Sequence, residues 1–196
     1  GVFLDEPTAV RWNSREATPT TPTTTSPGSA RIGWFPTPRP RVRTERMRRL
    51  ELLRHAKRDP KEDRLSAEGR AQAEDVGRES ARGYDAVFVS PAERAAETAA
   101  WIVRGSGQQL PEHAVIQGLA GKDATEGSPE GMAAGVRTLL AEVPEGGVGL
   151  AVGHTPFVER AMTGLTGREP SPFAECEGIR VILHDDGSLD VEEIRL

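Results

Sequence analysis

Two histidines and two arginines stand where side chains could act on a phosphoryl group. Arg54 and His55 follow one short apolar run, Ser90 and Arg94 follow a second, and His154 follows a third. Arg binds phosphate oxygens through two parallel charge-assisted hydrogen bonds. A neutral imidazole is a competent nucleophile and would form a covalent phosphohistidine. These residue types therefore predict a site where a histidine attacks phosphorus while cations balance the oxygens.

Alternating apolar runs and helical patterns must position these side chains. Such an alternation predicts an α/β fold, a three-layer sandwich whose mostly parallel central sheet is flanked by helices. Asp186-Gly187 joins two closing strands as a turn. The predicted strands are 48–54, 85–90, 148–153, 179–184 and 189–195, with a short one near Val115, and the predicted helices are 66–82, 91–104, 129–142 and one that opens at Thr155-Pro156.

Serines mark the expected starts of three helices. Ser66 is predicted to cap the helix over 66–82, and Ser128-Pro129-Glu130 to open the helix over 129–142. Ser90-Pro91-Ala92-Glu93 has the pattern of a capping box with proline at the first helical position. Ser90 is therefore expected to begin a helix and also to lie beside a bound phosphate.

The carboxyl ends of neighbouring parallel strands form one edge of a sheet, where ligands of α/β proteins bind. Helix N-termini at that edge also attract anions. We expect Arg54 and Arg94 to neutralise the phosphoryl oxygens, as phosphoryl transfer requires. His55 would be the nucleophile, kept unprotonated by the surrounding cations, and His154 would donate to a phosphoryl oxygen. This scheme needs no magnesium, so no metal or cofactor is predicted.

The 196-residue chain divides by composition. Hydrophobic residues make up only 36%, and the deficit lies in residues 1–46, which are rich in Thr and Pro. A segment of this kind buries too little apolar area to offset chain entropy. Residues 1–46 are therefore predicted to be a disordered extension, and residues 47–196 to be the folded domain. Trp12, Trp34 and Phe35 are the residues of the extension that could dock on the domain or on a partner.

Charge and cysteine content exclude several classes of function. Residues 1–46 carry a net charge of +3 within a chain of −5, so residues 47–196 carry −8. An acidic domain is a poor nucleic-acid binder. The lone Cys176 can form neither an internal disulfide nor a Cys-based zinc cluster. No apolar run reaches the roughly 18 residues of a membrane span. We expect a cytoplasmic protein with neither nucleic-acid nor membrane partners.

Three motifs in this order resemble the signature of the histidine phosphatase superfamily, which has the phosphoglycerate mutase-like fold. They are Leu53-Arg54-His55-Ala56-Lys57, Ser90-Pro91 with Arg94-Ala95 and Glu97-Thr98-Ala99, and Val152-Gly153-His154-Thr155-Pro156. The Arg-His-Ala-Lys form is most similar to bacterial phosphohistidine phosphatases. The resemblance implies that His55 accepts the phosphoryl group, that Arg54, Arg94 and His154 hold it, and that Ser90 shapes the phosphate-binding loop.

The sequence departs from the family pattern where many members carry a glutamate proton donor. Gly121 stands near the expected position, and Asp123 and Glu126 are the nearest candidate acids. A general acid commonly contributes about 10²–10⁴-fold in rate when an alkoxide leaves. A phosphoramidate has a weak P–N bond, and its nitrogen can take a proton from solvent. A missing donor therefore favours P–N bonds or activated esters over mutase activity on sugars, and phosphohistidine in proteins is the first-choice substrate.

Three other functions remain open. One is a phosphatase for a small phosphorylated metabolite, such as α-ribazole phosphate or a sugar phosphate. Another is a non-catalytic phosphate-binding module that uses its N-terminal extension for docking, which the absence of a donor acid would favour. The third is a metallohydrolase that uses His55, His154 and Asp123, although this spacing matches no common metal-ligand motif.

Overall fold

The structure is a computed structural model that describes residues 47–80, 82–120 and 127–196. The extension predicted over 1–46 and the candidate acids Asp123 and Glu126 lie outside the described residues. None of the helices within the described ranges has the length and hydropathy of a membrane span.

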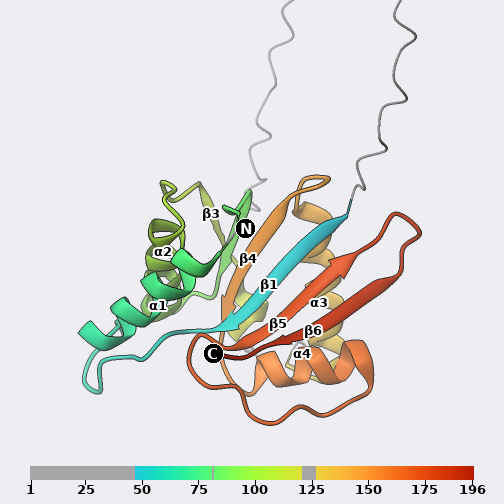
Figure 1. The fold of residues 1–196 in the computed structure, drawn as a ribbon. Coiled ribbons are helices and arrows are strands. Elements are labelled where there is room, and N and C mark those ends of the chain that lie inside the picture. The colour runs from blue at the N-terminus through green and yellow to red at the C-terminus, as the bar shows by residue number, and fades with distance from the viewer. Residues whose placement is uncertain (1–46, 81, 121–126) are drawn as a thin grey trace, which may run out of the picture. The chain divides into compact units, whose positions relative to one another are not determined.

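A six-stranded mixed sheet runs through the described residues in the order β3-β2-β4-β1-β5-β6 (Figure 1). Strand β1 pairs with β4 in parallel, as β2 does with β4 and β3, whereas β5 is antiparallel to both β1 and β6. The predicted α/β class with a mostly parallel sheet is confirmed. The strands are β1 (Arg48–Arg54), β2 (Ala86–Val89), β3 (His113–Val115), β4 (Val148–Gly153), β5 (Gly178–Leu183) and β6 (Leu189–Ile194), and the helices are α1 (Ala67–Glu79), α2 (Glu93–Gly105), α3 (Pro129–Glu142) and α4 (Phe157–Thr166), with a short 3₁₀ helix at Gln117–Ala120.

Helices cover both faces of the sheet (Figure 1). Successive strand residues point to opposite faces, so Leu52 of β1 joins the apolar cluster with α3 and α4, while Leu53 joins the cluster with α1 and α2. Strand β4 is buried along its whole length, as expected for a central strand packed on both sides. The two clusters hold the ends of β1 and β4 in fixed positions relative to each other.

Two of the three predicted serine caps are confirmed. The hydroxyl of Ser66 accepts a hydrogen bond from the N–H of Gly69, and that of Ser128 from the N–H of Gly131. The third prediction is wrong, because helix α2 starts at Glu93 with Ala92 as its N-cap and without a side-chain cap. The hydroxyl of Ser90 contacts His154 instead, at 2.7 Å from Nε2.

Helix α1 packs closely on the segment that follows His55. A Cβ atom on Gly69 would lie 2.0 Å from the carbonyl oxygen of Lys57, so glycine alone permits this approach. Ser66 and Lys57 add two further contacts, from the serine N–H and hydroxyl to the same carbonyl. The first helix therefore supports the chain immediately after the candidate nucleophile.

Candidate active site

The candidate site, defined as Arg54, His55, Arg94 and His154, lies at the carboxyl ends of β1 and β4 and at the start of α2. Arg54 is the register partner of Gly153 in the parallel β1–β4 pair, and the N–H of His55 donates to the Gly153 carbonyl at 3.0 Å. His55 and His154, the residues that directly follow the two strands, are therefore neighbours. The imidazole rings of His55 and His154 lie edge to face, with centroids 5.1 Å apart.

The tautomer of His55 follows from a single contact. Its Nδ1 lies 2.8 Å from the carbonyl oxygen of Ala56. A carbonyl oxygen can only accept a hydrogen bond, so Nδ1 must carry the proton. In the neutral ring the other nitrogen, Nε2, then holds a free lone pair. This is the protonation state that a nucleophilic histidine requires.

His154 is held in the opposite tautomer. Its Nδ1 lies 3.3 Å from Nη2 of Arg94, which can only donate, so Nδ1 accepts. The proton of the neutral ring is therefore on Nε2, which donates to the Ser90 hydroxyl at 2.7 Å. Ser90 is 1% exposed. Its role beside phosphate stays a prediction, and the contact that the structure shows is with His154.

The surroundings of His55 and His154 lower the pKa of both imidazoles, so both rings favour the neutral form. Burial is the largest cause that lowers the pKa of His55, followed by the positive charges of Arg94 and Arg54, although the bond to Ala56 acts in the opposite direction. Burial, then Arg94 and His55, lower the pKa of His154 to about 4. The sequence suggested like-charge repulsion as the reason for a neutral His55. Desolvation is the larger effect, and the arginines reinforce it.

Arg94 is held mainly by Asp63, from the segment between β1 and α1. The Nη1 of Arg94 pairs with Oδ1 of Asp63, whose other oxygen accepts from the N–H of Glu93 at 3.1 Å. These contacts outweigh burial and lower the pKa of Asp63. The carbonyl of Arg94 also accepts from the Thr98 hydroxyl, which in turn accepts from the N–H of Ala56 at 3.0 Å. Thr98 thus couples the start of α2 to the residue after His55.

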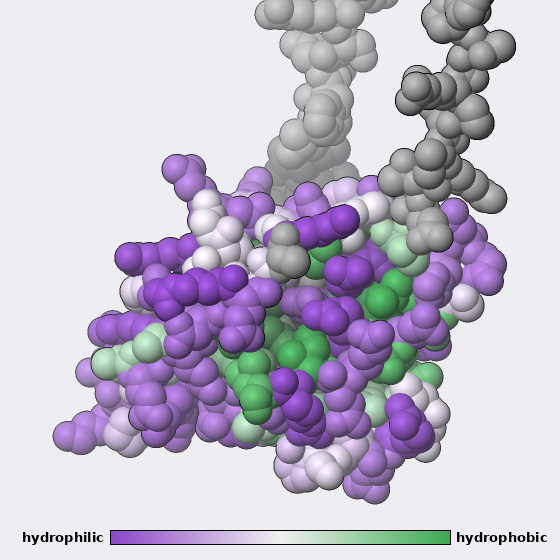
Figure 2. Space-filling model, viewed as in Figure 1, coloured by the Kyte–Doolittle hydropathy of each residue, from purple (hydrophilic) through white to green (hydrophobic). Residues whose placement is uncertain are grey.

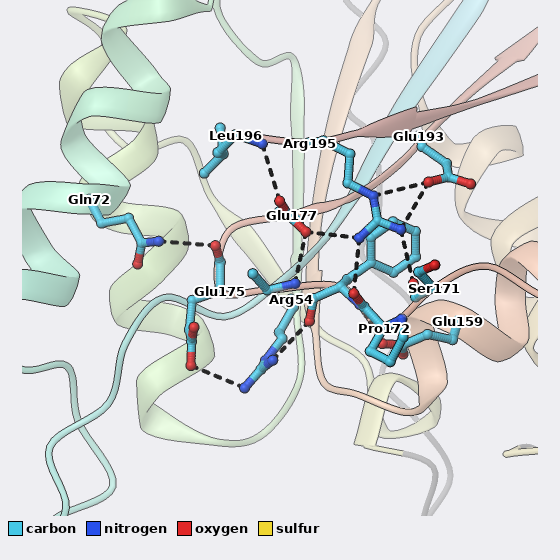
Figure 3. Close-up of polar contacts among 12 residues, drawn as sticks. Arg54, Gln72, Glu159, Ser171, Pro172, Glu175, Glu177, Glu193, Arg195 and Leu196 are labelled. Atoms are coloured by element: carbon cyan, nitrogen blue, oxygen red, sulfur yellow. Dashed lines mark hydrogen bonds and ion pairs between the residues drawn. The ribbon is translucent and has the colours of Figure 1, made fainter.

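Arg54 is held by a different segment, the 171–177 loop between α4 and β5 (Figure 3). Its Nη1 donates to the carbonyl of Phe173 at 2.8 Å, and its Nη2 donates to Glu175 Oε1 at 3.1 Å. The loop also contacts β1 through its backbone, because the N–H of Arg54 donates to Glu177 and the N–H of Cys176 donates to Arg54. The guanidinium therefore takes its position from the loop.

Each arginine of the site keeps one buried donor without a partner. Among the described residues, the Nε atoms of Arg54 and Arg94 are buried and make no hydrogen bond. An unpaired buried N–H costs about 1–3 kcal/mol, so such groups usually mark strain or a binding role. Arg49 Nε, outside the candidate site, is in the same state, so it is the positive charge of Arg54 and Arg94 beside two neutral imidazoles that suits an oxyanion.

Other residues considered from the sequence lie apart from this site. Lys57 is exposed and pairs with Glu68, and His184 pairs with Asp190 on the closing strands. His113 is exposed on β3. Cys176 is fully buried, and burial raises the pKa of its thiol to about 12, so it is no nucleophile.

Asp63, Thr98 and Glu175 were missed as parts of the site. Asp63 and Glu175 contact the arginines across 31 and 121 residues of sequence, and no local pattern signals such contacts. Thr98 stood within the quoted motif, but its role there was not inferred from the sequence. Within the described ranges, no group of three or more His, Cys, Asp or Glu side chains is arranged to hold a metal ion.

The model of the histidine phosphatase superfamily (branch 1) matches residues 50–120. The resemblance to this superfamily is confirmed. The matched range contains Arg54, His55, Ser90 and Arg94 but ends before His154. Among curated proteins, no sequence matches the chain.

Several solved structures share the fold. The protein histidine phosphatase SixA complexed with tungstate is 21% identical in sequence, with a TM-score of 0.59. The match covers 75% of this chain and 96% of the SixA chain. Phosphoserine phosphatase from Entamoeba histolytica is 18% identical with a TM-score of 0.59, covering 76% and 97%. Phosphoglycerate mutase from Bacillus anthracis str. Sterne is 13% identical with a TM-score of 0.63, covering 77% and 94%. The fold is therefore phosphoglycerate mutase-like, as the sequence predicted.

Proposed function

We propose that the protein is a phosphatase that works through a phosphohistidine intermediate at His55. One observation carries the proposal. His55 has a free lone pair on Nε2, and the centroid of its ring is 5.1 Å from the centroid of the neutral His154 ring. Positive charge from Arg54 and Arg94 acts on both rings. The superfamily match and the phosphatases among the structural neighbours support a phosphatase hydrolase.

The proposed reaction has two steps. Nε2 of His55 attacks phosphorus in line with the leaving group, the bond from phosphorus to the leaving atom breaks, and that atom takes up a proton. A water molecule then attacks the phosphohistidine, which releases inorganic phosphate and returns the lone pair to Nε2. Arg54 and Arg94 stabilise the charge on the equatorial oxygens throughout.

His154 is the second proposed catalytic residue. Its Nε2–H is engaged by Ser90, so donation to a phosphoryl oxygen requires that contact to open. A site that is neutral at both imidazoles also leaves the positive charge of the arginines available to the substrate dianion. Ser90 is proposed to hold His154, and a direct contact with phosphate is the alternative.

Phosphohistidine in a protein is the proposed substrate. Of the described carboxylates, Asp63 and Glu175 contact the arginines of the site, and the pKa of Asp63 is lowered, so it is a poor proton donor. Asp123 and Glu126 remain candidate acids outside the described residues. A P–N bond needs a donor less than an ester does. SixA, one of the structural neighbours, is a protein histidine phosphatase.

A trapping experiment tests the intermediate. The protein is incubated with ³²P-labelled phosphohistidine peptide in excess chelator and quenched in alkali, where phosphohistidine survives. We expect labelled His55 in the wild type and none in His55→Ala. The matched control is His184→Ala, since His184 pairs with Asp190 on the closing strands, and it should be labelled normally.

The result separates the competing functions. Tight phosphate binding without label would indicate a binding module, and loss of turnover in chelator would indicate a metallohydrolase. Relative rates decide the substrate class: kcat/KM should favour a phosphohistidine peptide over an unactivated alkyl phosphate by at least about 10²-fold, the smaller contribution of a general acid. Equal values would favour a phosphatase for small phosphorylated metabolites.

The boundary of the domain and the location remain proposals. Residues 47–196 are proposed to be the catalytic domain and 1–46 an extension outside it. The cytoplasmic location predicted from the sequence also stays a prediction.

A further inference from the structure

We propose that the ion pair between Glu177 and Arg195 positions Arg54, and thereby sets the catalytic competence of the site from the far side of the 171–177 loop. Neither residue belongs to the motifs that carry the superfamily resemblance. The proposal deepens the proposed function, on which its rate readout rests.

The first step is the dependence of Arg54 on the loop. Both terminal nitrogens of its guanidinium are bonded to loop atoms, the carbonyl of Phe173 and the carboxylate of Glu175. The loop itself belongs to no helix or strand. Its backbone groups therefore need partners outside regular structure, and a shift of the loop would carry the guanidinium with it.

The second step is how the loop is fixed. Arg195 donates from Nη1 to the Pro172 carbonyl at 3.0 Å and from Nη2 to the Ser171 carbonyl at 2.9 Å. Its guanidinium also lies over the Phe173 ring, 4.1 Å from the centroid. Arg195 thus contacts the three loop residues that lead to the carbonyl holding Arg54 (Figure 3).

Glu177 completes the arrangement from inside. Its Oε2 accepts from Arg195 at 2.9 Å and from the N–H of Ala174 at 2.8 Å, and its Oε1 accepts from the N–H of Leu196 at 3.2 Å. Burial opposes its charge, but these bonds outweigh burial and lower the pKa of Glu177. Glu177 is only 9% exposed. Its carboxylate is therefore a buried anion that accepts hydrogen bonds from Ala174 within the loop and from Arg195 and Leu196 after strand β6.

This geometry requires an arginine. The fork of Arg195 reaches two carbonyls and two carboxylates, those of Glu177 and Glu193, together, whereas the ammonium of lysine is a single point with three donors. Arg195 is also among the residues that line a cavity of about 390 Å³, with Arg49, Glu51 and Tyr84. Figure 2 shows this face as mainly hydrophilic with apolar patches over β5 and β6.

The test compares Arg195→Ala with a matched control, Arg180→Ala. Arg180, on strand β5, also pairs with a partly buried carboxylate, Glu51 of β1, and its side chain makes no hydrogen bond or ion pair with the described loop residues. We expect Arg195→Ala to lower kcat/KM for p-nitrophenyl phosphate by about 10- to 100-fold, because a displacement of about 1 Å can cost about 10²-fold. Arg195→Lys should recover part of the loss, and Arg180→Ala should stay near the wild type.

A second readout is independent of turnover. Because the charge of Arg54 helps to lower the pKa of His55, a displaced Arg54 lets that pKa rise towards 6.5, which NMR titration of the imidazole measures. The titration is done with all variants well below their unfolding temperatures. An unchanged His55 pKa in Arg195→Ala, or a rate loss no larger than that of Arg180→Ala, would overturn the proposal. If the wild type shows no turnover at all, the proposed function fails and the titration alone decides this inference.

Discussion

The two arginines of the site are held in different ways. Arg54 is bonded to a backbone carbonyl and to a carboxylate of one loop, and that loop is tied by the Glu177–Arg195 pair. Arg94 is bonded to the side chain of Asp63, which is 48% exposed, and to the ring of His154. The Arg54 guanidinium therefore has a backbone carbonyl among its partners, whereas both partners of the Arg94 guanidinium are side chains.

This difference suggests a division of labour. Preorganised donors are worth most where charge develops in the transition state, because they need no reorganisation. Arg54 fits that role. Arg94 touches both an exposed acid and an imidazole, so it is suited to adjust its contacts when a substrate dianion enters. The following predictions test this contrast.

Arg54→Lys should have the largest effect. Lysine cannot make both contacts with the 171–177 loop, so we expect kcat for p-nitrophenyl phosphate to fall by about 10²–10³-fold, the usual cost of one lost preorganised donor. Arg94→Lys should cost only about tenfold, since an ammonium can still pair with Asp63. Steady-state kinetics of the two variants at equal folded fraction decide the matter. Equal losses, or a larger loss at Arg94, would contradict the contrast.

His154 should make the fold sensitive to mild acid. Its pKa of about 4 lies below the unfolded value of 6.5, so the unfolded chain binds the proton first as pH falls. The stability that neutral His154 contributes is complete above pH 6.5 and is lost towards pH 4, by up to about 3 kcal/mol. Urea unfolding across this range measures it.

The variants Arg94→Met and Arg54→Met distinguish the two sides in that experiment. Arg94 is the second-largest of the four causes that lower the pKa of His154, and Arg54 is the smallest of them. Arg94→Met should therefore flatten the loss of stability between pH 6.5 and 4 more than Arg54→Met does. The reverse order would show that Arg94 is not the dominant neighbour of this imidazole.

The sequence predicted the strand ends well because the signals there are local. Apolar runs end at Arg54 and Val89, and the parallel arrangement then brings their carboxyl ends to one edge. The supports of the arginines could not be found in this way. Phe173 holds Arg54 across 119 residues, and such pairing depends on the packed loop and not on any pattern near Arg54.

Ser90 shows how a local rule can be overridden. Its motif satisfied the pattern of a capping box, but its hydroxyl bonds to His154, which lies 64 residues further along the chain. A serine oxygen can serve a helix N-terminus or a side chain brought by the fold, and here the contact with the buried imidazole at 2.7 Å is shorter than the one with the N–H of Ala92 at 3.4 Å. The candidate acids Asp123 and Glu126 are untested for another reason, since they lie outside the described residues.

Thr98→Val should destabilise the Arg94 side without touching a charge. The hydroxyl of Thr98 bridges the Ala56 N–H and the Arg94 carbonyl, and the residue is fully buried. Valine keeps the shape but leaves a buried N–H without a partner, which costs about 1–3 kcal/mol. Thermal or urea unfolding measures this, with Thr98→Ser as the control that keeps the bond. A loss below about 0.5 kcal/mol would mean that the bridge does not couple α2 to the residue after His55.

Asp63→Asn should have the smallest effect of the series. The side chain of Asp63 is 48% exposed and that of Arg94 is 23% exposed. Exposed ion pairs contribute about 0.2–1 kcal/mol, so we expect a loss of stability in that range. Asparagine can still accept from Arg94 and from the Glu93 N–H, so kcat/KM should change by only a few fold, and less at high salt. Glu62→Gln is the matched control, because this neighbouring acid pairs with Arg64 and not with Arg94. A loss as large as that of Arg54→Lys would contradict the contrast, because it would mean that Asp63 fixes Arg94 as firmly as the 171–177 loop fixes Arg54.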